Sequence, residues 1–253
     1  MSESTNTIKA IERVIDILEC FTPEKPELGI SEISRLTGMY KSTVFRIVQT
    51  LVTRGMLVQD PDTKRAMLGF KVFELGAVAG SNIEVRRVAR LLMEELGDRT
   101  RETINLSIEN MGERVCIEMV ESKEMVRNFV QVGTRGPLYL GATGKVLLAF
   151  MSTEQIEKVL QKKLNEQVVN RQDLLAQLEE IRDKHYSVSS EERVVGATAV
   201  CAPVKDHGNR VVAALTVSGP TMRFPTNRVD QLIDEVKEYA LRISKRLGYT
   251  GEF

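Results

Sequence analysis

The chain has no tryptophan, two histidines and three cysteines among its 253 residues. Cys20, Cys116 and Cys201 stand far apart, and no CxxC pair occurs. Zinc ribbons and dithiol redox motifs need closely spaced cysteines, so the sequence excludes both. We expect all three thiols to be reduced and buried, and to serve as small apolar side chains.

Long apolar runs are also missing. No stretch approaches the roughly 18 apolar residues that a transmembrane helix requires. The first 21 residues carry acids and lack the basic start and continuous apolar stretch of a signal peptide. We therefore expect a cytoplasmic protein without a membrane partner.

Net charge is absent as well, because 35 basic side chains balance 35 acidic ones. This balance excludes a uniformly basic nucleic-acid binder but leaves room for a local basic face. One window, 33–59, contains no Asp or Glu and carries Arg35, Lys41, Arg46 and Arg54. Basic and acidic residues are thus unevenly distributed along the chain, and the acid-free window is a candidate for the local basic face.

The apolar spacing before this window predicts two helices. The first carries a helical stripe of Ile8, Ile11, Ile15 and Leu18. A short second helix follows, with Ser31 as its expected N-cap and with Ile33 and Leu36 facing inward. Gly38 then permits a tight turn.

A third helix is expected from Lys41 to about Arg54. Its apolar positions repeat at helical spacing, and its other face is polar. Two short strands around an Asp-Pro-Asp-Thr turn at 60–63 predict a β-hairpin. A short helix, a glycine turn, a polar-faced helix and a hairpin together indicate a winged helix-turn-helix over residues 1–68.

The third helix is the candidate DNA reader. In a helix-turn-helix the start of the second helix enters the major groove, and Lys41, Ser42 and Thr43 lie there. Arg46 follows one turn later, where a guanidinium can reach a guanine edge or a phosphate. Lys64 and Arg65 in the wing suit flanking phosphates. The alternative is a protein-interaction module with a solvated polar face.

The remaining sequence predicts an α+β domain with an antiparallel sheet and flanking helices. A linker helix is expected over 69–82, followed by a domain over 83–253. Helices are expected over 83–101, 153–163, 171–185 and 226–247. Strands are expected over 103–108, 115–120, 126–132, 186–189, 197–205 and 210–218.

Catalysis finds no support in the sequence. His185 and His207 look exposed, and Glu191 and Glu192 would point to opposite faces of a strand. The segment 141–145, Gly-Ala-Thr-Gly-Lys, fails as a phosphate loop, since it lacks the first glycine and the hydroxyl after lysine. It is either a general anion site at a helix start or a capped helix with a tight turn. We expect no enzyme, no cofactor and no metal.

Six segments together carry a family resemblance. In chain order they are IKAIERVIDILECF (8–21), KSTVFRIVQTL (41–51), FELG (73–76), GKVLLA (144–149), ALTVSGP (214–220) and RISKRLGY (242–249). Their order and spacing resemble the IclR family of transcription regulators over essentially the whole chain. The resemblance implies a winged helix domain, a linker helix and a GAF-like effector-binding domain. It also implies dimers or tetramers, an operator in double-stranded DNA, and a small carboxylate effector, with the regulators of sugar-acid catabolism as the nearest kind.

The family's pocket positions fall on Gly141, Ala142, Thr143, Ser189, Ala199, Thr216 and Ser218 of this sequence. Many members have Asp where Ser189 stands and Cys where Ala199 stands. Cys201 lies two residues further on the same strand, so we add it to the pocket. These departures imply a ligand that differs from the simplest keto acids.

The strand pattern supports such a pocket independently. Thr216 and Ser218 alternate with Leu215 and Val217, so both hydroxyls share one face of a strand. Near a helix start, such neutral donors could hold a carboxylate without a buried arginine. Otherwise the two hydroxyls are simply bonded within the sheet. The rival functions are an enzyme built on the second domain and a scaffold whose helix-turn-helix binds protein.

Overall fold

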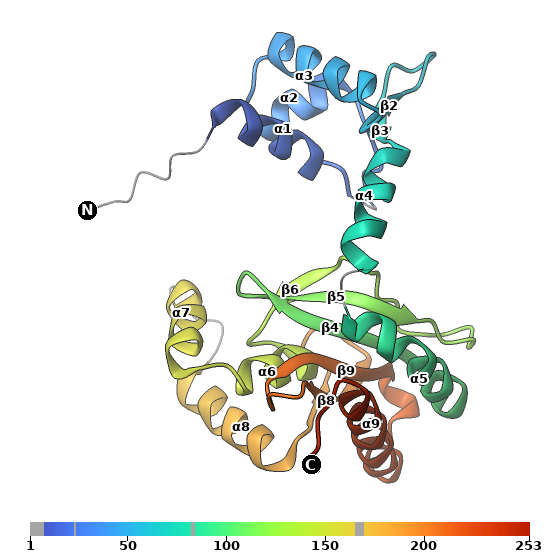
Figure 1. Ribbon diagram of the computed structural model, residues 1–253, viewed down its shortest axis with the longest axis vertical. Helices are drawn as coiled ribbons and strands as arrows, with labels where there is room; N and C mark the ends of the chain where they lie inside the picture. Colours follow the sequence, from blue (N-terminus) through green and yellow to red (C-terminus); the bar gives the residue numbers. More distant parts are fainter. Residues whose placement is uncertain (1–7, 23, 82–83, 165–169) are drawn as a thin grey trace. The chain divides into compact units, whose positions relative to one another are not determined.

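The computed structural model describes residues 8–22, 24–81, 84–164 and 170–253 (Figure 1). The chain forms two compact units, Met1–Asn82 and Ile83–Phe253. We refer to them as the N-terminal unit and the C-terminal unit.

The N-terminal unit combines helices with a small sheet. Its helices are α1 (Lys9–Glu19), α2 (Ile30–Thr37), α3 (Lys41–Thr53) and α4 (Phe70–Ser81). The strands β1 (Glu27–Leu28), β2 (Leu57–Gln59) and β3 (Ala66–Leu68) pair in the order β1-β3-β2. Ile17, Ile33, Val44, Val48 and Leu57 pack together as its core. The predicted helix-turn-helix followed by a wing is therefore confirmed.

The beginning of α2 differs from the prediction. Its N-cap is Gly29 rather than Ser31, because the Glu32 carboxylate accepts a hydrogen bond of 2.8 Å from the Gly29 N–H. Gly38 ends the helix in the left-handed region, with φ of 70°. Leu36, expected to face inward, is 48% exposed. The two-residue strand β1 was not predicted.

The described part of the C-terminal unit contains a six-stranded antiparallel sheet. The strand order is β6-β5-β4-β9-β8-β7. The strands are β4 (Thr103–Asn110), β5 (Glu113–Val120), β6 (Arg135–Pro137), β7 (Ser187–Ser190), β8 (Ala197–Lys205) and β9 (Val211–Pro220). The expected α+β class with an antiparallel sheet is thus confirmed.

Helices cover both faces of this sheet (Figure 1). On one face lie α5 (Glu84–Thr100) and α9 (Thr226–Arg246), which share an apolar core with the sheet. On the other lie α6 (Gly141–Ala149), α7 (Thr153–Leu164) and α8 (Arg171–Lys184), with a second apolar core. A 3₁₀ turn, Thr221–Arg223, joins β9 to the last helix.

Side-chain alternation on β9 separates these two cores. Leu215 and Val217 pack with α5 and α9. Thr216 and Ser218 therefore point to the face that α6 covers, because successive strand residues alternate. Both hydroxyl side chains are nearly inaccessible to solvent, with exposures of 1% and 2%. The polar site of this unit consequently lies on the α6 side of the sheet.

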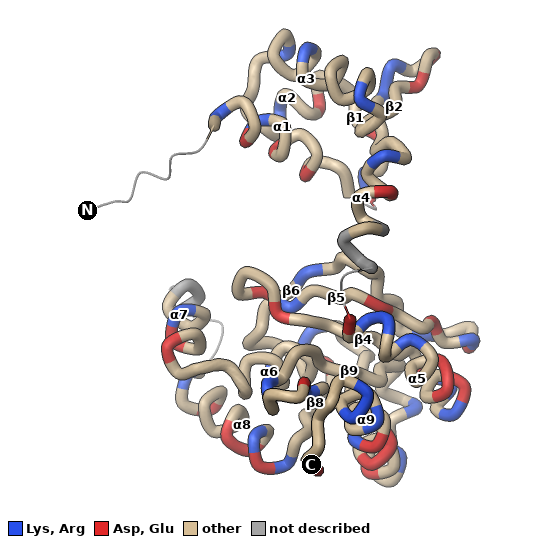
Figure 2. Tube along the Cα trace, in the orientation of Figure 1, with Lys and Arg blue, Asp and Glu red and all other residues tan. Residues whose placement is uncertain are grey.

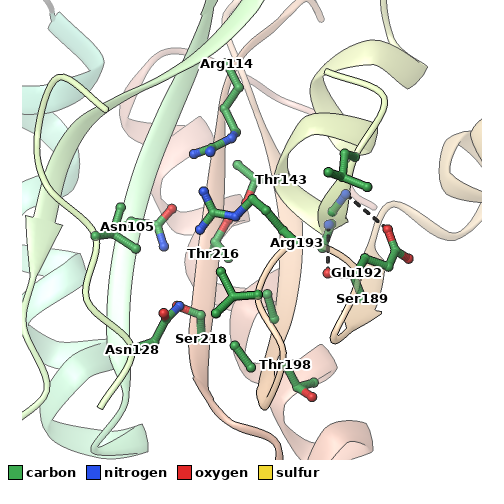
Figure 3. A pocket seen from close by; sticks show the side chains of 17 residues that line it. Asn105, Arg114, Asn128, Thr143, Ser189, Glu192, Arg193, Thr198, Thr216 and Ser218 are labelled. Carbon is green, nitrogen blue, oxygen red and sulfur yellow. Dashed lines mark hydrogen bonds between the residues drawn. The ribbon is translucent and has the colours of Figure 1, made fainter. Parts of the chain in front are cut away.

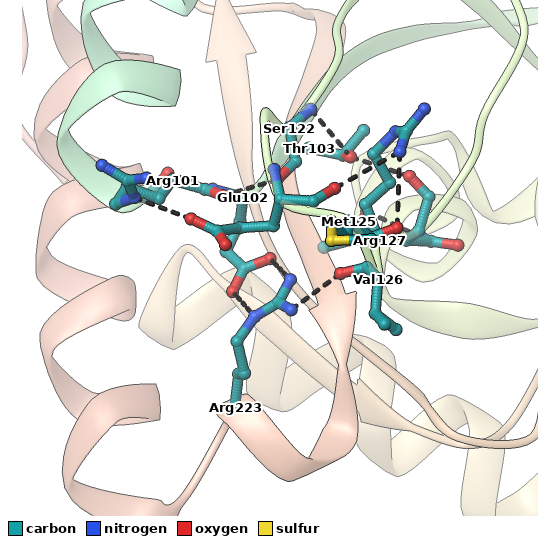
Figure 4. Close-up of polar contacts among 12 residues, drawn as sticks. Arg101, Glu102, Thr103, Ser122, Met125, Val126, Arg127 and Arg223 are labelled. Carbon is teal, nitrogen blue, oxygen red and sulfur yellow. Dashed lines mark hydrogen bonds and ion pairs between the residues drawn. The ribbon is translucent and has the colours of Figure 1, made fainter.

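The strand predicted over 126–132 is wrong. The chain between β5 and β6 has no strand, although its residues favour one. Its carbonyl groups accept hydrogen bonds from side chains instead. Thr103 Oγ1 donates to Asn128 O at 2.7 Å, and Arg223 donates to Val126 O at 2.7 Å (Figure 4). A segment held by side chains in this way makes no strand ladder.

Two expectations about single residues are also wrong. Cys116 and Cys201 are buried as expected, but Cys20 is only half-buried. His185 is not exposed, because its ring stacks between Phe150 and Phe253 at centroid distances of 5.9 and 5.5 Å. His207 is exposed, as predicted.

Candidate DNA-binding surface and effector cavity

Helix α3 presents the predicted groove-reading side chains on its outer face. Lys41, Ser42 and Arg46 are exposed, and Thr43 is half-buried. The opposite face is anchored in the core by buried apolar residues, so the helix can offer its polar side to a partner. Figure 2 shows no acidic residue along α3, which leaves the surface open to a polyanion.

The two wing residues behave differently. Lys64 is exposed at the wing turn, with φ of 57°. Arg65 instead makes an ion pair with Glu32 at 2.9 Å and donates to the Glu27 carbonyl at 2.7 Å. Arg65 thus fastens the wing to α2 and β1, and it is less free for a phosphate than its sequence position suggested.

One candidate DNA contact was missed. Tyr40, directly before α3, is 85% exposed. An aromatic residue at the N-cap position, where Ser, Thr, Asp or Asn is preferred, was the available signal.

In the C-terminal unit, residues from distant parts of the chain line one cavity of about 40 Å³. Seven of the eight predicted effector residues line it, namely Gly141, Ala142, Thr143, Ser189, Ala199, Thr216 and Ser218. The remaining lining residues are Asn105, Arg114, Asn128, Val130, Leu140, Glu192, Arg193, Val194, Ala197 and Thr198.

Cys201, the eighth predicted residue, does not line the cavity. It is fully buried in the apolar core behind it, and burial raises the pKa of its thiol to about 12. Cys201 shares a strand face with Ala199, but this position alone does not place it in the cavity, because the cavity ends before Cys201. Its thiol is a core side chain.

Hydrogen bonds connect the hydroxyl groups around the cavity. The Thr143 and Thr216 hydroxyls lie 2.9 Å apart and join α6 to β9. The Asn128 amide donates to Ser218 Oγ at 2.9 Å. Polar groups from three separate segments are thus held in place by bonds within the protein.

The start of α6 is already occupied by the protein itself. Ser189 Oγ accepts from the Ala142 N–H at 3.0 Å, and the Glu192 carboxylate accepts from the Gly141 N–H at 3.1 Å. Glu192 also binds Lys145, at 2.8 Å from both oxygens. A carboxylate therefore already rests at this helix start, where the dipole favours negative charge.

Two arginines missed in the sequence enter the same cavity. Arg114 on β5 is only 3% exposed, and its Nη2 atom has no hydrogen-bond partner in the described structure. Arg193, after β7, is exposed as a residue but extends its guanidinium toward that of Arg114 (Figure 3). Burial lowers the pKa of both, and the charge of Arg193 lowers that of Arg114 further. The expectation of a site without a buried arginine is wrong.

The irregular segment that carries Asn128 and Val130 is fixed from outside the cavity (Figure 4). Glu102 accepts two hydrogen bonds of 2.6 Å from Arg223, and Glu102 is 5% exposed. Ser122 Oγ donates to Arg101 O at 2.6 Å. This cluster ties the end of α5 and the turn after β9 to the segment that forms one cavity wall.

Comparison with known proteins assigns the chain to a family. The model described as "IclR helix-turn-helix domain" matches residues 10–61, and "Bacterial transcriptional regulator IclR C-terminal" matches residues 77–245. The chain belongs to the IclR family of transcription regulators. It is a DNA-binding transcription regulator rather than an enzyme, as predicted, because its relatives are regulators.

Curated relatives extend over nearly the whole chain. The regulator KdgR of Escherichia coli K12 is 33% identical and covers 98% of this chain and 96% of its own length. XynR of the same strain is 32% identical over 96% of this chain and 98% of its own. AllR, named as a transcriptional repressor, is 33% identical over 95% and 90%.

Solved structures agree with the fold. An IclR homologue from Microbacterium hydrocarbonoxydans, described as complexed with 4-hydroxybenzoate, superposes with a TM-score of 0.83 at 26% identity, over 94% of this chain and 98% of that one. The Thermotoga maritima IclR structure gives 0.75 at 27% identity over the same shares. In the described part of this IclR-family chain, no His, Cys, Asp and Glu group could hold a metal, and no helix could cross a membrane.

Proposed function

We propose that the chain binds an operator through α3 and the wing, and that a small carboxylate in the C-terminal cavity controls this binding. The observation that carries the effector half of the proposal is the cavity itself, where preformed hydroxyl, amide and guanidinium groups converge. An effector changes operator affinity only if it binds the DNA-competent and DNA-incompetent states unequally.

For the DNA half, we assign base and phosphate contacts to Lys41, Ser42, Thr43 and Arg46, with Lys64 at the wing. Four of the five are exposed and Thr43 is half-buried, and they belong to one acid-free helix and to the wing turn. Because phosphate contacts release counterions, operator affinity should fall steeply with salt. Action on a chromosomal operator implies a cytoplasmic protein, and repression is the mode suggested by the name of AllR.

Self-association completes this proposal. Ile8, the N-cap of α1, and Ile11 and Ile15 within α1 are exposed by 64%, 54% and 47%. The three residues follow helical spacing along one face. On α4, Phe70 and Phe73 are 69% and 67% exposed, and their rings contact each other in a tilted arrangement with centroids 5.3 Å apart. Apolar side chains gathered in this way mark an interface, and a second copy of the chain is the partner we propose.

The test is an electrophoretic mobility shift with the DNA upstream of the chain's own gene, with and without small organic acids. Binding that one acid alters, without turnover of that acid, is the expected result. Failure of the purified protein to retard this DNA in low salt would count against the operator, and turnover of the acid would favour an enzyme instead.

A further inference from the structure

The hydroxyl groups near the C-terminal end of α3 are bonded to the helix itself. Thr50 Oγ1 donates to Arg46 O at 2.9 Å, and Thr53 Oγ1 donates to Gln49 O at 2.9 Å. Both hydroxyl hydrogens are therefore used within the protein. This half of the helix offers a base edge no free hydroxyl donor.

The Gln49 side chain is turned toward the wing. Its Nε2 atom donates to Gln59 Oε1 on β2 at 3.1 Å, and Gln59 Nε2 donates to Lys64 O at the wing turn at 2.8 Å. A free glutamine on a groove-reading helix could pair with adenine through its amide. Here the amide connects α3 to the wing instead, so it stabilises the position of the wing beside the helix.

The first turns of α3 carry side chains without such bonds. In the part of the chain that the structure describes, no hydrogen bond or ion pair engages the side chains of Lys41, Ser42 and Arg46, and all three are exposed. Phe45 follows Lys41 by four residues and Ser42 by three, so helical spacing places it on the same face. Its side chain is 52% exposed.

Exposure alone does not distinguish Phe45, because single apolar side chains are common on protein surfaces. Its surroundings do. The structure describes α3 throughout, and the helix carries no acidic side chain (Figure 2), while cationic and hydroxyl side chains surround the ring. The family assignment makes DNA the partner of this unit. An apolar ring on such a surface requires an apolar feature of DNA as its contact.

The major groove offers one such feature. Thymine presents a C5-methyl group there, whereas the bases otherwise present mainly hydrogen-bond donors and acceptors. Contact between this methyl group and a phenyl ring removes apolar surface of both from water. Arg46, the next residue, can hydrogen-bond to a guanine edge, so the two neighbouring side chains suit groups of different chemistry.

We infer that Phe45 is a specificity-determining residue that contacts a thymine methyl group in each operator half-site. The inference rests on the proposed function, since α3 must enter the major groove for this contact to form. It adds to the polar contacts assigned there one that depends on a methyl group and on no hydrogen bond.

The test removes the methyl group alone. The full chain binds DNA from upstream of its own gene in which deoxyuridine partly replaces thymidine. Bound and free DNA are separated by mobility shift and cleaved at uracil. Uracil keeps every hydrogen-bonding group of thymine, so interference marks methyl contacts. The variants are Phe45→Ala and Phe45→Gln, and Phe129→Ala is the matched control, because it removes a 60% exposed ring from the C-terminal unit.

In the wild type we expect uracil to interfere at one or more thymines in each half-site. A duplex with one such thymine replaced should bind about fourfold more weakly, which corresponds to the ~0.8 kcal/mol gained by burying one methyl-sized group. Both Phe45 variants should bind the thymine duplex more weakly and lose the preference over uracil at that position, since only coupled groups change each other's effect. Phe129→Ala should keep the affinity and the preference. If Phe45→Ala does not fold, Phe45→Gln still decides the question.

A preference for thymine that survives in both Phe45 variants would overturn the inference. So would a wild type that retards the DNA but shows no interference at any thymine. Either result leaves the proposed function intact. A wild type that does not retard this DNA at low salt overturns the proposed function and the Phe45 contact together.

Discussion

At Gly136 a single hydrogen atom in place of a methyl group leaves room for a guanidinium. Because the nearest atom to an added Cβ is Arg114 Nη2, at 2.6 Å, Gly136→Ala should displace the end of a flexible side chain rather than backbone. We expect the fold to survive and the affinity for the effector acid to fall several-fold. Calorimetry on the folded variant measures this.

The control for this substitution is Gly76→Ala on α4, where no atom lies within 4 Å of an added Cβ. It should leave acid affinity unchanged, and as a helix-interior change it should stabilise by roughly 0.5–1 kcal/mol. Equal acid affinity in Gly136→Ala and wild type would show that Arg114 need not keep this position.

Residue by residue, strand alternation predicted more of the cavity than any motif did. It was enough to place Thr216 and Ser218 together, and family positions added the start of α6 and Ser189. Arg114 directly precedes the strand predicted over 115–120, and β5 in fact begins at Glu113, so only an earlier strand start would have placed its side chain on a covered face. Arg193 had no signal in the sequence, because it lies in a loop whose path depends on tertiary contacts.

At the scale of elements, the junction of α8 and β7 couples stability to pH. Burial, and then the charges of Lys205 and Lys237, lower the pKa of His185, while Asp183 opposes them. Lys205 Nζ lies 3.3 Å from the ring Nε2. The folded state thus prefers neutral His185, and the unfolded chain takes up the proton first, near pH 6.5.

The direction of the pH effect on stability follows, because the unfolded chain binds the His185 proton at a higher pH than the folded chain does. Below about pH 6.5 the unfolded state binds more protons at this site, so the free energy of unfolding should fall as the pH falls toward the lower folded pKa. Urea unfolding of wild type and His185→Gln between pH 5 and 8 measures the difference, with His207→Gln as the exposed control. A wild type and His185→Gln with parallel pH profiles would contradict it.

Helix α3 carries the second prediction at this scale. Arg46 is exposed, so Arg46→Ala opens no cavity in the core. Loss of a bidentate base contact should cost about 1–3 kcal/mol in operator affinity. Fluorescence anisotropy with operator DNA measures the change, and Arg135→Ala controls for net charge. A folded Arg46→Ala with wild-type operator affinity would remove Arg46 from the contact set.

Helices were predicted closely because their apolar period extends over many residues. The predicted third helix, Lys41 to about Arg54, ends one residue beyond α3, and β8 has the predicted bounds. The short strand β1 and the irregular segment before β6 escaped prediction for the same reason: tertiary pairing decides them. In 126–132 strand propensity is overridden because Arg223 and Thr103 bind its carbonyl groups.

For the whole molecule, the proposal that α1 and α4 form an interface between two copies is tested by the oligomeric state. Phe73→Glu places a charge in the proposed interface, and loss of a central aromatic contact typically costs about 2 kcal/mol or more. We expect dissociation to shift to at least tenfold higher concentration in analytical ultracentrifugation. Met111→Glu, at an 88% exposed hairpin turn of the C-terminal unit, should leave association unchanged.

Operator geometry follows from the same symmetry. Two copies related by a two-fold axis present two α3 helices, so the operator should be a partial palindrome with half-sites about one helical turn, or a multiple of it, apart. Hydroxyl-radical footprinting should show paired protected half-sites for the wild type. Phe73→Glu should protect them only at much higher concentration, because each half-site is then bound without its partner. Protection of a single asymmetric half-site by a monomeric wild type would refute the dimer, and with it the assignment of the α1 and α4 faces to self-association.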